Sequence, residues 1–218
     1  MTEAETAGVL ESVRVTSVLR EDIILGRRRP GSRLVERDIA AELQVSRLPV
    51  REAIRTLAAE GIVVSRPRTW AVVREFTHRD IQEFGEVREA IETLIFVFAA
   101  QRHDEAGLEQ LREVLVREQA AAEAREEDAA RIAASDFHEV ASRLAGNAML
   151  NELIEVFVTR LRWLFGQHDD LIGMAEEHRR IFEAVERRDV DALRVLIPAH
   201  LAAGQRAAAR RLDASLAI

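Results

Sequence analysis

The amino-acid sequence predicts a mainly α-helical protein, with an N-terminal winged helix-turn-helix followed by an all-α bundle of about six helices. Gly totals 10 and Pro 4 in 218 residues and Tyr is absent, which leaves too few turn-forming and aromatic residues for an all-β fold. Apolar residues recur at helical spacing through most of the chain, interrupted by one pair of β-branched runs near residue 70. We therefore expect two domains, residues 1–76 and 77–218.

The composition excludes several kinds of chemistry. Cysteine is absent, so disulfides, thiolate zinc sites and cysteine nucleophiles are excluded. All 31 basic residues are arginine, which excludes Schiff-base chemistry and a phosphate loop built on lysine. Residues Met1–Thr6 do not begin a secretory signal, and the apolar run Leu94–Ala100 is far shorter than the ~20 residues that span a bilayer. We expect a cytoplasmic protein with no membrane partner.

The net charge of −7 is distributed unevenly along the chain. Residues 1–76 carry 13 arginines against 11 acidic residues, whereas residues 77–218 carry 18 against 27. Within residues 20–74 there are 12 arginines against 7 acidic residues. An arginine-rich front and an acidic rear are typical of a small DNA-binding module joined to a domain with another task, although chance unevenness gives the same pattern.

Two helices and a turn open the front domain. The first helix is expected over Val9–Leu25 and ends at Gly26, because its apolar residues have a loose helical spacing that stops there. The pair Pro30-Gly31 marks a turn. A short second helix is then expected over Glu36–Leu43.

A third helix and a hairpin complete the front domain. The helix is expected over Arg47–Glu60, with Ser46 as its N-cap and Pro49 in its first turn, where the missing N–H is harmless. The β-branched runs Ile62–Val64 and Ala71–Val73 then predict a small hairpin. Three helices followed by a hairpin make a winged helix-turn-helix, whose third helix enters the major groove of DNA.

The third helix carries a row of arginines. Arg47, Arg51 and Arg55 recur every four residues on the face opposite its apolar side. A guanidinium can hold a guanine edge or a phosphate with two parallel donors, so such a row suits a helix that reads DNA. The alternative is a solvated face on which Arg51 and Arg55 pair with Glu52 or Glu60. The cap before the helix and the arginines of the hairpin loop favour DNA binding.

Three stretches of the front domain resemble the GntR family of bacterial transcription regulators: Pro30–Ala40, Val45–Ile54 and Leu57–Val63. The resemblance continues through the rear domain and implies a ligand-responsive regulator that binds a double-stranded DNA operator. The DNA-binding residues that we expect from this resemblance and from the wing are Arg37, Ser46, Arg47, Leu48, Pro49, Arg51, Arg68 and Thr69.

Three positions depart from the pattern of the family. Leu48 stands where a threonine is usual, which removes a hydroxyl contact. Gln44 replaces the usual glycine of the turn between the second and third helices. Thr69 stands near the usual wing-tip glycine, where the backbone approaches the minor groove.

The rear domain reads as a helical bundle that starts at Thr77, which forms a capping-box pattern with Asp80. The apolar stripe of its first helix consists of Ile81, Phe84, Val87, Ile91, Leu94, Ile95 and Phe98. Further helices are expected over Glu105–Glu126, Ala129–Leu144, Leu150–Phe165, Leu171–Arg187 and Val190–Leu212. The bundle resembles the ligand-binding FCD domain of the FadR branch of the family, and its six-helix length suits the VanR-like group.

Arg88 lies on the buried stripe of the first rear helix. A buried cation must be paired, because an unpaired one is very costly. One interpretation is an internal salt bridge to Glu92 or to a neighbouring helix, and the other is a clamp for a carboxylate ligand in the bundle core. The resemblance implies the clamp, because in the family the arginine at this position faces the effector.

Three histidines lie on the inward stripes of three different helices: His138, His178 and His200. Taken alone, each is more often a core histidine bonded to a carbonyl group. Together they can converge inside one bundle, and neutral imidazoles suit Zn or Ni. In the metal-binding members of the family, histidines matching these three hold a divalent metal.

The same family members add an aspartate one helical turn before the first histidine. Ala134 stands at that position, and Asp136, two residues further, points about 200° away. The resemblance therefore implies a site for Zn or Ni formed by the three histidines. Its fourth ligand is water, the carboxylate of the effector, or absent.

These features together predict a transcriptional regulator and not an enzyme. We expect a homodimer, because one recognition helix reads only half of an operator. A small organic acid held by Arg88 and by the metal would favour one spacing of the two DNA-binding heads. One alternative is a metal-dependent enzyme at the three histidines, although no glutamate can be placed beside them as a general base. The other is a nucleoid-type protein that binds DNA regardless of sequence.

Overall fold

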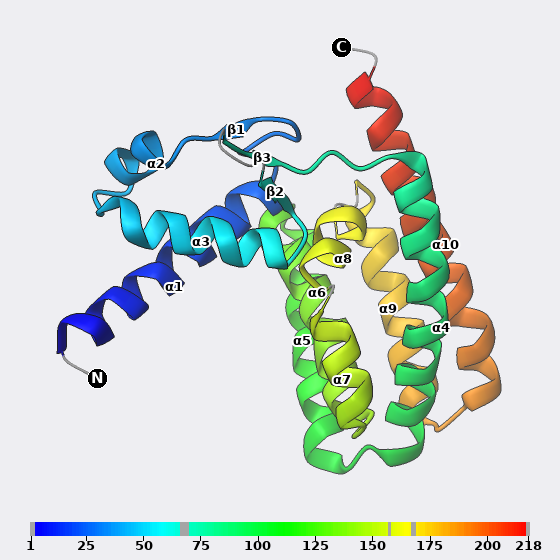
Figure 1. Ribbon diagram of the computed structural model, residues 1–218. Helices are drawn as coiled ribbons and strands as arrows, with labels where there is room; N and C mark the ends of the chain where they lie inside the picture. Colours follow the sequence, from blue (N-terminus) through cyan, green and yellow to red (C-terminus); the bar gives the residue numbers. More distant parts are fainter. Residues whose placement is uncertain (1–2, 66–69, 157, 167–168, 217–218) are drawn as a thin grey trace. The chain divides into compact units, whose positions relative to one another are not determined.

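The computed structural model describes residues 3–65, 70–156, 158–166 and 169–216 (Figure 1). The chain is mainly helical, which confirms the predicted fold class. Its internal contacts divide it into two compact units. The N-terminal unit contains the described residues up to Phe76 together with Val156–Trp163, and the helical unit contains Thr77–Glu155 and the described residues from Leu164 onward.

Three helices and a small antiparallel sheet form the part of the N-terminal unit that precedes Thr77 (Figure 1). The helices are α1 (Glu3–Ile24), α2 (Glu36–Glu42) and α3 (Arg47–Ala59), and the strands are β1 (Arg33–Leu34), β2 (Val63–Ser65) and β3 (Ala71–Val73). The strand order is β1-β3-β2. Leu19 and Ile23 of α1 pack with Val50 and Leu57 of α3, and all four side chains are fully buried. This core holds α3 in place and leaves its opposite face outward.

The N-terminal unit differs from the prediction in three details. Helix α1 begins at Glu3 and not at Val9. Strand β1 was not expected, because it has only two residues and depends on a distant partner: Arg33 lies opposite Val72, and Leu34 lies opposite Ala71. Ser46 occupies the N-cap position of α3, but its side chain makes no cap hydrogen bond. The third residue of the helix is a proline, which has no N–H to offer to the serine hydroxyl.

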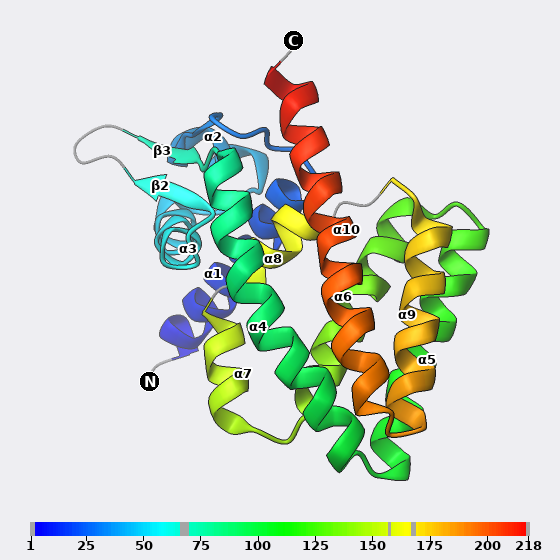
Figure 2. The same cartoon turned by 90° about the vertical axis from the view of Figure 1, so that its right-hand side faces the viewer.

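The helical unit is built mainly from long helices that lie side by side (Figure 2). Among the described residues they are α4 (His78–Arg102), α5 (Glu105–Glu123), α6 (Glu127–Leu144), α7 (Ala148–Glu155), α9 (Leu171–Glu186) and α10 (Val190–Leu216). Helix α5 packs along α6, and α4 packs along α10. The start of α4 confirms the predicted capping box, because the Thr77 hydroxyl accepts from the backbone N–H of Asp80 at 3.1 Å and the Asp80 carboxylate accepts from the N–H of Thr77 at 2.7 Å.

One predicted helix is two helices in the structure. The segment Leu150–Phe165 was expected to be continuous, but it divides into α7, which ends at Glu155, and α8 (Val158–Phe165). The physical reason is tertiary, because α7 packs in the helical unit whereas Val156–Trp163 packs in the N-terminal unit. The bundle therefore has one more helix boundary than the sequence pattern indicates.

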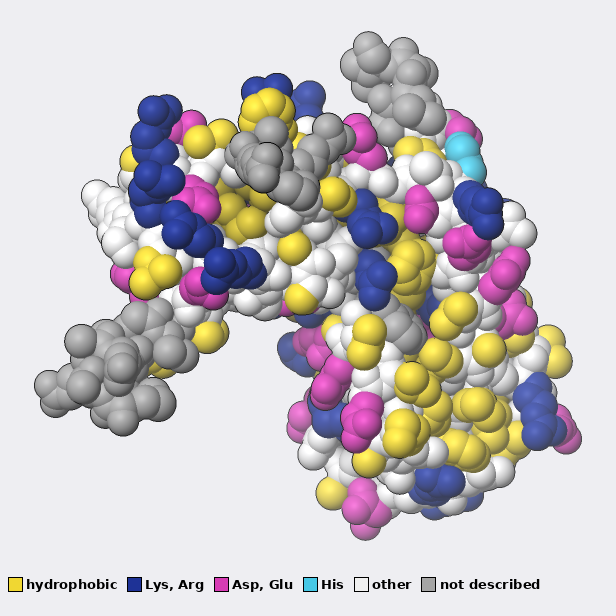
Figure 3. Space-filling model, in the orientation of Figure 1, with side chains coloured by type: hydrophobic (Ala, Val, Ile, Leu, Met, Phe, Trp, Pro, Cys, Tyr) yellow, Lys and Arg dark blue, Asp and Glu magenta, His cyan; other side chains and the backbone are white. Residues whose placement is uncertain are grey.

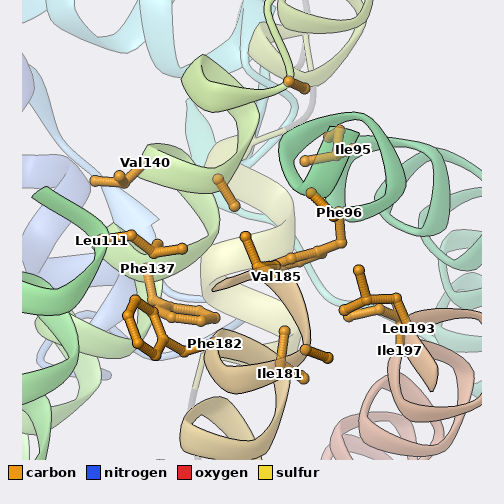
Figure 4. Packing of buried hydrophobic residues seen from close by; sticks show 14 of the residues in the cluster. Ile95, Phe96, Leu111, Phe137, Val140, Ile181, Phe182, Val185, Leu193 and Ile197 are labelled. Atoms are coloured by element: carbon orange, nitrogen blue, oxygen red, sulfur yellow. The ribbon is translucent and has the colours of Figure 1, made fainter. Parts of the chain in front are cut away.

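The core of the helical unit is a single apolar cluster that draws on all of its long helices. Figure 4 shows Phe96 of α4, Phe137 of α6, Ile181 of α9 and Ile197 of α10 pointing toward one another. Two residues of the predicted α4 stripe do not point inward, because Val87 and Leu94 are 49% and 46% exposed. Among the described residues, no helix has the length and apolarity needed to cross a membrane.

Candidate metal centre and nucleic-acid interface

Three helices of the helical unit bring three histidines together. His138 comes from α6, His178 from α9 and His200 from α10. The Nε2 atom of His178 lies 3.2 Å from that of His138 and 3.3 Å from that of His200, and the remaining Nε2 pair is separated by 3.4 Å. His178 and His200 are buried and His138 is half-buried.

A glutamate lies against the other ring nitrogen of each histidine. The Nδ1 atom of His178 is 2.7 Å from a carboxylate oxygen of Glu118 on α5, and that of His200 is 2.8 Å from Glu177 on α9. The Nδ1 atom of His138 is 2.6 Å from the Oε2 atom of Glu92 on α4. An ionised carboxylate in this position favours the tautomer that carries its proton on Nδ1, which leaves Nε2 available to a metal.

This arrangement fits a divalent metal. Three nitrogen lone pairs that face one another repel, and a cation between them removes that repulsion. A tetrahedral site with metal–nitrogen bonds of about 2.0–2.1 Å separates its ligand nitrogens by about 3.3–3.4 Å. The observed Nε2 separations of 3.2, 3.3 and 3.4 Å match this geometry. A carboxylate–histidine–metal arrangement also orients the rings and raises their basicity as ligands.

Burial sets the protonation of this centre. It lowers the pKa of His178 well below its usual range and that of His200 to about 3, so both rings are neutral and able to bind a metal at pH 7. Burial also raises the pKa of Glu118 to about 8. A divalent cation on the Nε2 atoms would oppose this effect by stabilising the charged carboxylate.

The structure places no aspartate in the group. Ala134 is buried one turn before His138, and Asp136 lies on another side of α6, where it is 3.4 Å from Arg117. Among the described residues, the group able to hold a metal consists of the three histidines alone. Within the described residues, a tetrahedral metal held by these three histidines would have a fourth position open to another ligand.

Arg88 adjoins the metal centre through one of these glutamates. It is buried, and its Nε donates to Glu92 Oε1 at 2.6 Å, while Oε2 of the same carboxylate faces His138. The internal salt bridge that the sequence allowed therefore exists. Burial alone would raise the pKa of Glu92, but Arg88 and His138 hold it well below its usual range. Glu92 thus links the predicted clamp to the predicted metal centre.

Sequence reasoning missed the glutamates that orient the histidines. It named Glu92 only as a partner for Arg88, and it placed no glutamate beside the histidines. Glu118 offered a signal, since it lies at helical spacing on the same stripe as Leu111 and Leu115. A charged residue on a buried stripe needs a partner, and here that partner is a histidine 60 positions away.

Five of the eight predicted DNA-binding residues are exposed on the N-terminal unit. Arg37, Arg47, Leu48 and Arg51 are exposed around the start of α3, as is Ser46. Figure 3 shows a band of arginine side chains over α2 and the N-terminal half of α3. Arg68 and Thr69 lie outside the described residues.

Pro49 differs from the five exposed residues. It is buried in the first turn of α3. A DNA contact through its ring is therefore not supported by its position. Its role at the operator stays a prediction from the resemblance to the family.

Acidic residues accompany the arginine row. Glu36 of α2 lies 3.2 Å from Arg47 and 3.0 Å from Arg51, and Arg55 lies 2.8 Å from Glu52. The predicted pairing of Arg55 with Glu52 is thus present, whereas Arg51 pairs with Glu36 and not with Glu52. A groove runs beside these residues, lined among others by Val35, Glu36, Arg37, Arg47, Arg51 and Trp70.

Comparison with known protein families identifies both halves of the chain. Residues 11–73 match the family described as "Bacterial regulatory proteins, gntR family". Residues 83–203 match the family described as "FCD domain". The second match alone covers more than half of the chain.

Individual relatives cover most of the chain. The HTH-type transcriptional repressor RspR of Escherichia coli (strain K12) is 29% identical over 86% of this chain and 84% of its own length. The gluconate operon transcriptional repressor of Bacillus subtilis (strain 168) is 32% identical over 81% of this chain and 76% of its own length. A crystal structure of a GntR transcriptional regulator from Rhodococcus sp. RHA1 superimposes with a TM-score of 0.76 and 27% identity, covering 90% of this chain and 96% of that one.

Proposed function

Because this chain belongs to the GntR family of bacterial regulators and carries an FCD domain, it is a DNA-binding transcriptional regulator, and we propose that a small organic acid controls its operator binding. The matched families and relatives are regulators and not enzymes, so the metalloenzyme alternative is not supported. We further place the chain in the FadR branch, in its VanR-like group. The proposed location is the cytoplasm, where the operator would be.

The metal is the first part of the proposal. Zn²⁺ or Ni²⁺ would be held by the Nε2 atoms of His138, His178 and His200. The single observation that carries this part is that the three Nε2 atoms lie within 3.4 Å of one another while each Nδ1 faces a glutamate. Such a metal would act as a Lewis acid that holds an anionic oxygen ligand.

The effector is the second part. The open fourth position of the metal and the guanidinium of Arg88 are two attachment points for a carboxylate. Arg88 donates to Glu92 from Nε, on the side edge of its guanidinium group. The end edge of a guanidinium group, formed by Nη1 and Nη2, can hold a carboxylate with two parallel hydrogen bonds. A small organic acid would therefore be recognised by charge and by planar geometry.

The homodimer is the third part. Exposed apolar side chains gather on α4 and α7, which Figures 1 and 2 show beside each other. They are Val87 and Leu94 on α4 and Met149 and Leu153 on α7. Figure 3 shows hydrophobic atoms over this face of the helical unit. A contiguous apolar face is costly in water, and a second copy of the chain would cover it.

One set of measurements tests the metal and the effector together. Elemental analysis of the purified chain should give about one Zn or Ni per chain. A thermal-shift panel of carboxylic acids should then contain a compound that raises the melting temperature, since a ligand at 100 times its Kd stabilises by about 2.7 kcal/mol. The same compound should change the affinity for operator DNA.

Matched variants make this test specific. Arg88→Lys keeps the positive charge but removes the planar fork, and it should abolish the thermal shift caused by the acid. Arg79→Lys, at an exposed position on the same helix, should leave the shift unchanged. Absence of any bound metal in the wild type would refute the metal, and an acid that stabilises Arg88→Lys equally well would refute the clamp.

A further inference from the structure

The two arginines at the start of the recognition helix share one carboxylate. Glu36 Oε1 accepts from Arg51 Nε at 3.1 Å, and its Oε2 accepts from Arg51 Nη2 at 3.0 Å. The same Oε2 also accepts from Arg47 Nη2 at 3.2 Å. Glu36 is the first residue of α2, so one residue of the preceding helix fixes two side chains of α3.

The edge of Arg51 that Glu36 occupies determines what the arginine can still bind. A guanidinium has a side edge, formed by Nε and Nη2, and an end edge, formed by Nη1 and Nη2. Glu36 bonds the side edge with two parallel hydrogen bonds. The end edge is the one that reaches furthest from the helix, and a bidentate contact to O6 and N7 of guanine uses two such donors.

The carboxylate lies beneath the guanidinium groups and not above them. The side chain of Glu36 is 25% exposed, whereas those of Arg51 and Arg47 are 46% and 63% exposed. DNA can therefore approach both arginines without first removing Glu36. The hydrogen bond from Arg51 lowers the pKa of Glu36, so the carboxylate is charged at neutral pH.

We propose that Glu36 is a positioning residue of the operator interface, which presents the end edge of Arg51 to a guanine and weakens attachment to DNA of the wrong sequence. The inference rests on the assignment of this face to operator binding. A fixed side chain loses less conformational entropy when it binds a base edge. The negative charge also opposes the phosphate contacts that supply most of the affinity for non-specific DNA.

The experiment compares two DNA duplexes for each variant. The wild-type chain selects a preferred duplex from a library with 30 randomised base pairs, and a shuffled duplex of the same composition serves as the non-specific probe. The quantity measured is the Kd for the shuffled duplex divided by the Kd for the preferred duplex, at one fixed salt concentration. A high ratio means high sequence specificity. A variant that is partly unfolded loses affinity for both duplexes equally, so the ratio does not respond to a loss of folding.

Three substitutions separate positioning from charge. Glu36→Gln removes the charge, and Glu36→Asp keeps the charge but shortens the side chain, so that it no longer reaches both donors of Arg51. Both should lower the ratio roughly tenfold, within the range that one bidentate base contact contributes. Glu52→Gln removes the same charge from the partner of Arg55 on the same face, and it should change both Kd values together and leave the ratio unchanged.

The outcomes are distinguishable. A ratio that falls in both Glu36 variants but not in Glu52→Gln supports the positioning role. A ratio that is unchanged in Glu36→Asp, or that falls equally in Glu52→Gln, overturns it, because charge alone would then explain the effect. A wild-type chain that selects no duplex would overturn the operator interface itself, and with it the role of Glu36.

Discussion

At the scale of single residues, the proposed metal centre would depend on side chains that do not bind the metal directly. His178 is oriented by Glu118, which comes from another helix and is buried with it. We predict that His178→Ala abolishes metal binding and that Glu118→Gln weakens it 10- to 100-fold, because the carboxylate fixes the tautomer and the direction of the ring. Competition with a chromophoric chelator measures both effects.

The control for this prediction lies on the same helix. Glu123 is the last residue of α5 and has the same type of side chain as Glu118. Its side chain is exposed, whereas that of Glu118 is buried against His178. Glu123→Gln should leave the metal affinity unchanged. Equal affinities for the Glu118 and Glu123 variants would show that the carboxylate at position 118 does not support the centre.

The arginines of α3 give a second prediction at this scale. Arg47→Ala and Arg51→Ala should each weaken operator binding, by about 1–3 kcal/mol if the lost contact is to a base. Both side chains are exposed on the operator face, so their removal should leave the fold intact. Gel-shift titration measures the loss, with Arg194→Ala on α10 as a control of equal charge. Undiminished affinity in both variants would contradict the assignment of α3 as the recognition helix.

At the scale of elements, three non-glycine residues of the described segments lie in the left-handed region of backbone space: Gln44, Arg125 and Arg188. Gln44, between α2 and α3, has φ of +55°, and Arg188, between α9 and α10, has φ of +56°. For a residue with a side chain, this conformation costs about 1–2 kcal/mol relative to the right-handed helical conformation. Glycine does not have that cost because it has no Cβ atom. The missing turn glycine noted in the sequence thus falls at a strained position.

The turns at Gln44 and Arg188 should respond in opposite directions to glycine. Gln44→Gly should raise the free energy of unfolding by up to about 1 kcal/mol, because relief of strain exceeds the added flexibility of the unfolded chain. Arg188→Gly should lower it, because the Arg188 guanidinium donates to the carbonyl oxygens of Ala100 at 2.7 Å and His103 at 2.9 Å. Urea unfolding measures both, and destabilisation by Gln44→Gly would refute the strain argument.

Helix starts were easier to predict than helix continuity. The capping box at Thr77 and the apolar period after it located α4, since a cap and a helical stripe are encoded within a few neighbouring residues. The division between α7 and α8 was missed, because it depends on which unit each half packs against. Strand β1 was missed for a related reason, because a two-residue strand exists only through its partner.

At the scale of the whole molecule, the apolar face of α4 and α7 is the candidate dimer contact. We predict that Leu94→Arg combined with Leu153→Arg converts a dimer into a monomer, because each arginine would have to be desolvated in the contact. Light scattering coupled to size exclusion measures the mass. Operator affinity should fall as well, because a monomer reads only one half-site.

Val195 provides the control for the dimer prediction. It is 71% exposed on α10, outside the apolar face of α4 and α7. Val195→Arg should therefore leave the mass unchanged. If the double variant retains the mass of a dimer, then the α4 and α7 face is not the contact.

The sequence by itself determined the helical class, the outward row of arginines on α3, and the inward placement of Arg88 and the three histidines. These properties follow from residue spacing, because a period of 3.6 assigns each side chain to one face of its own helix. Only the tertiary structure decided which groups meet: Glu118 with His178, Glu177 with His200, and Glu36 with Arg51. All three pairings join different helices, so each depends on how helices pack and not on local period.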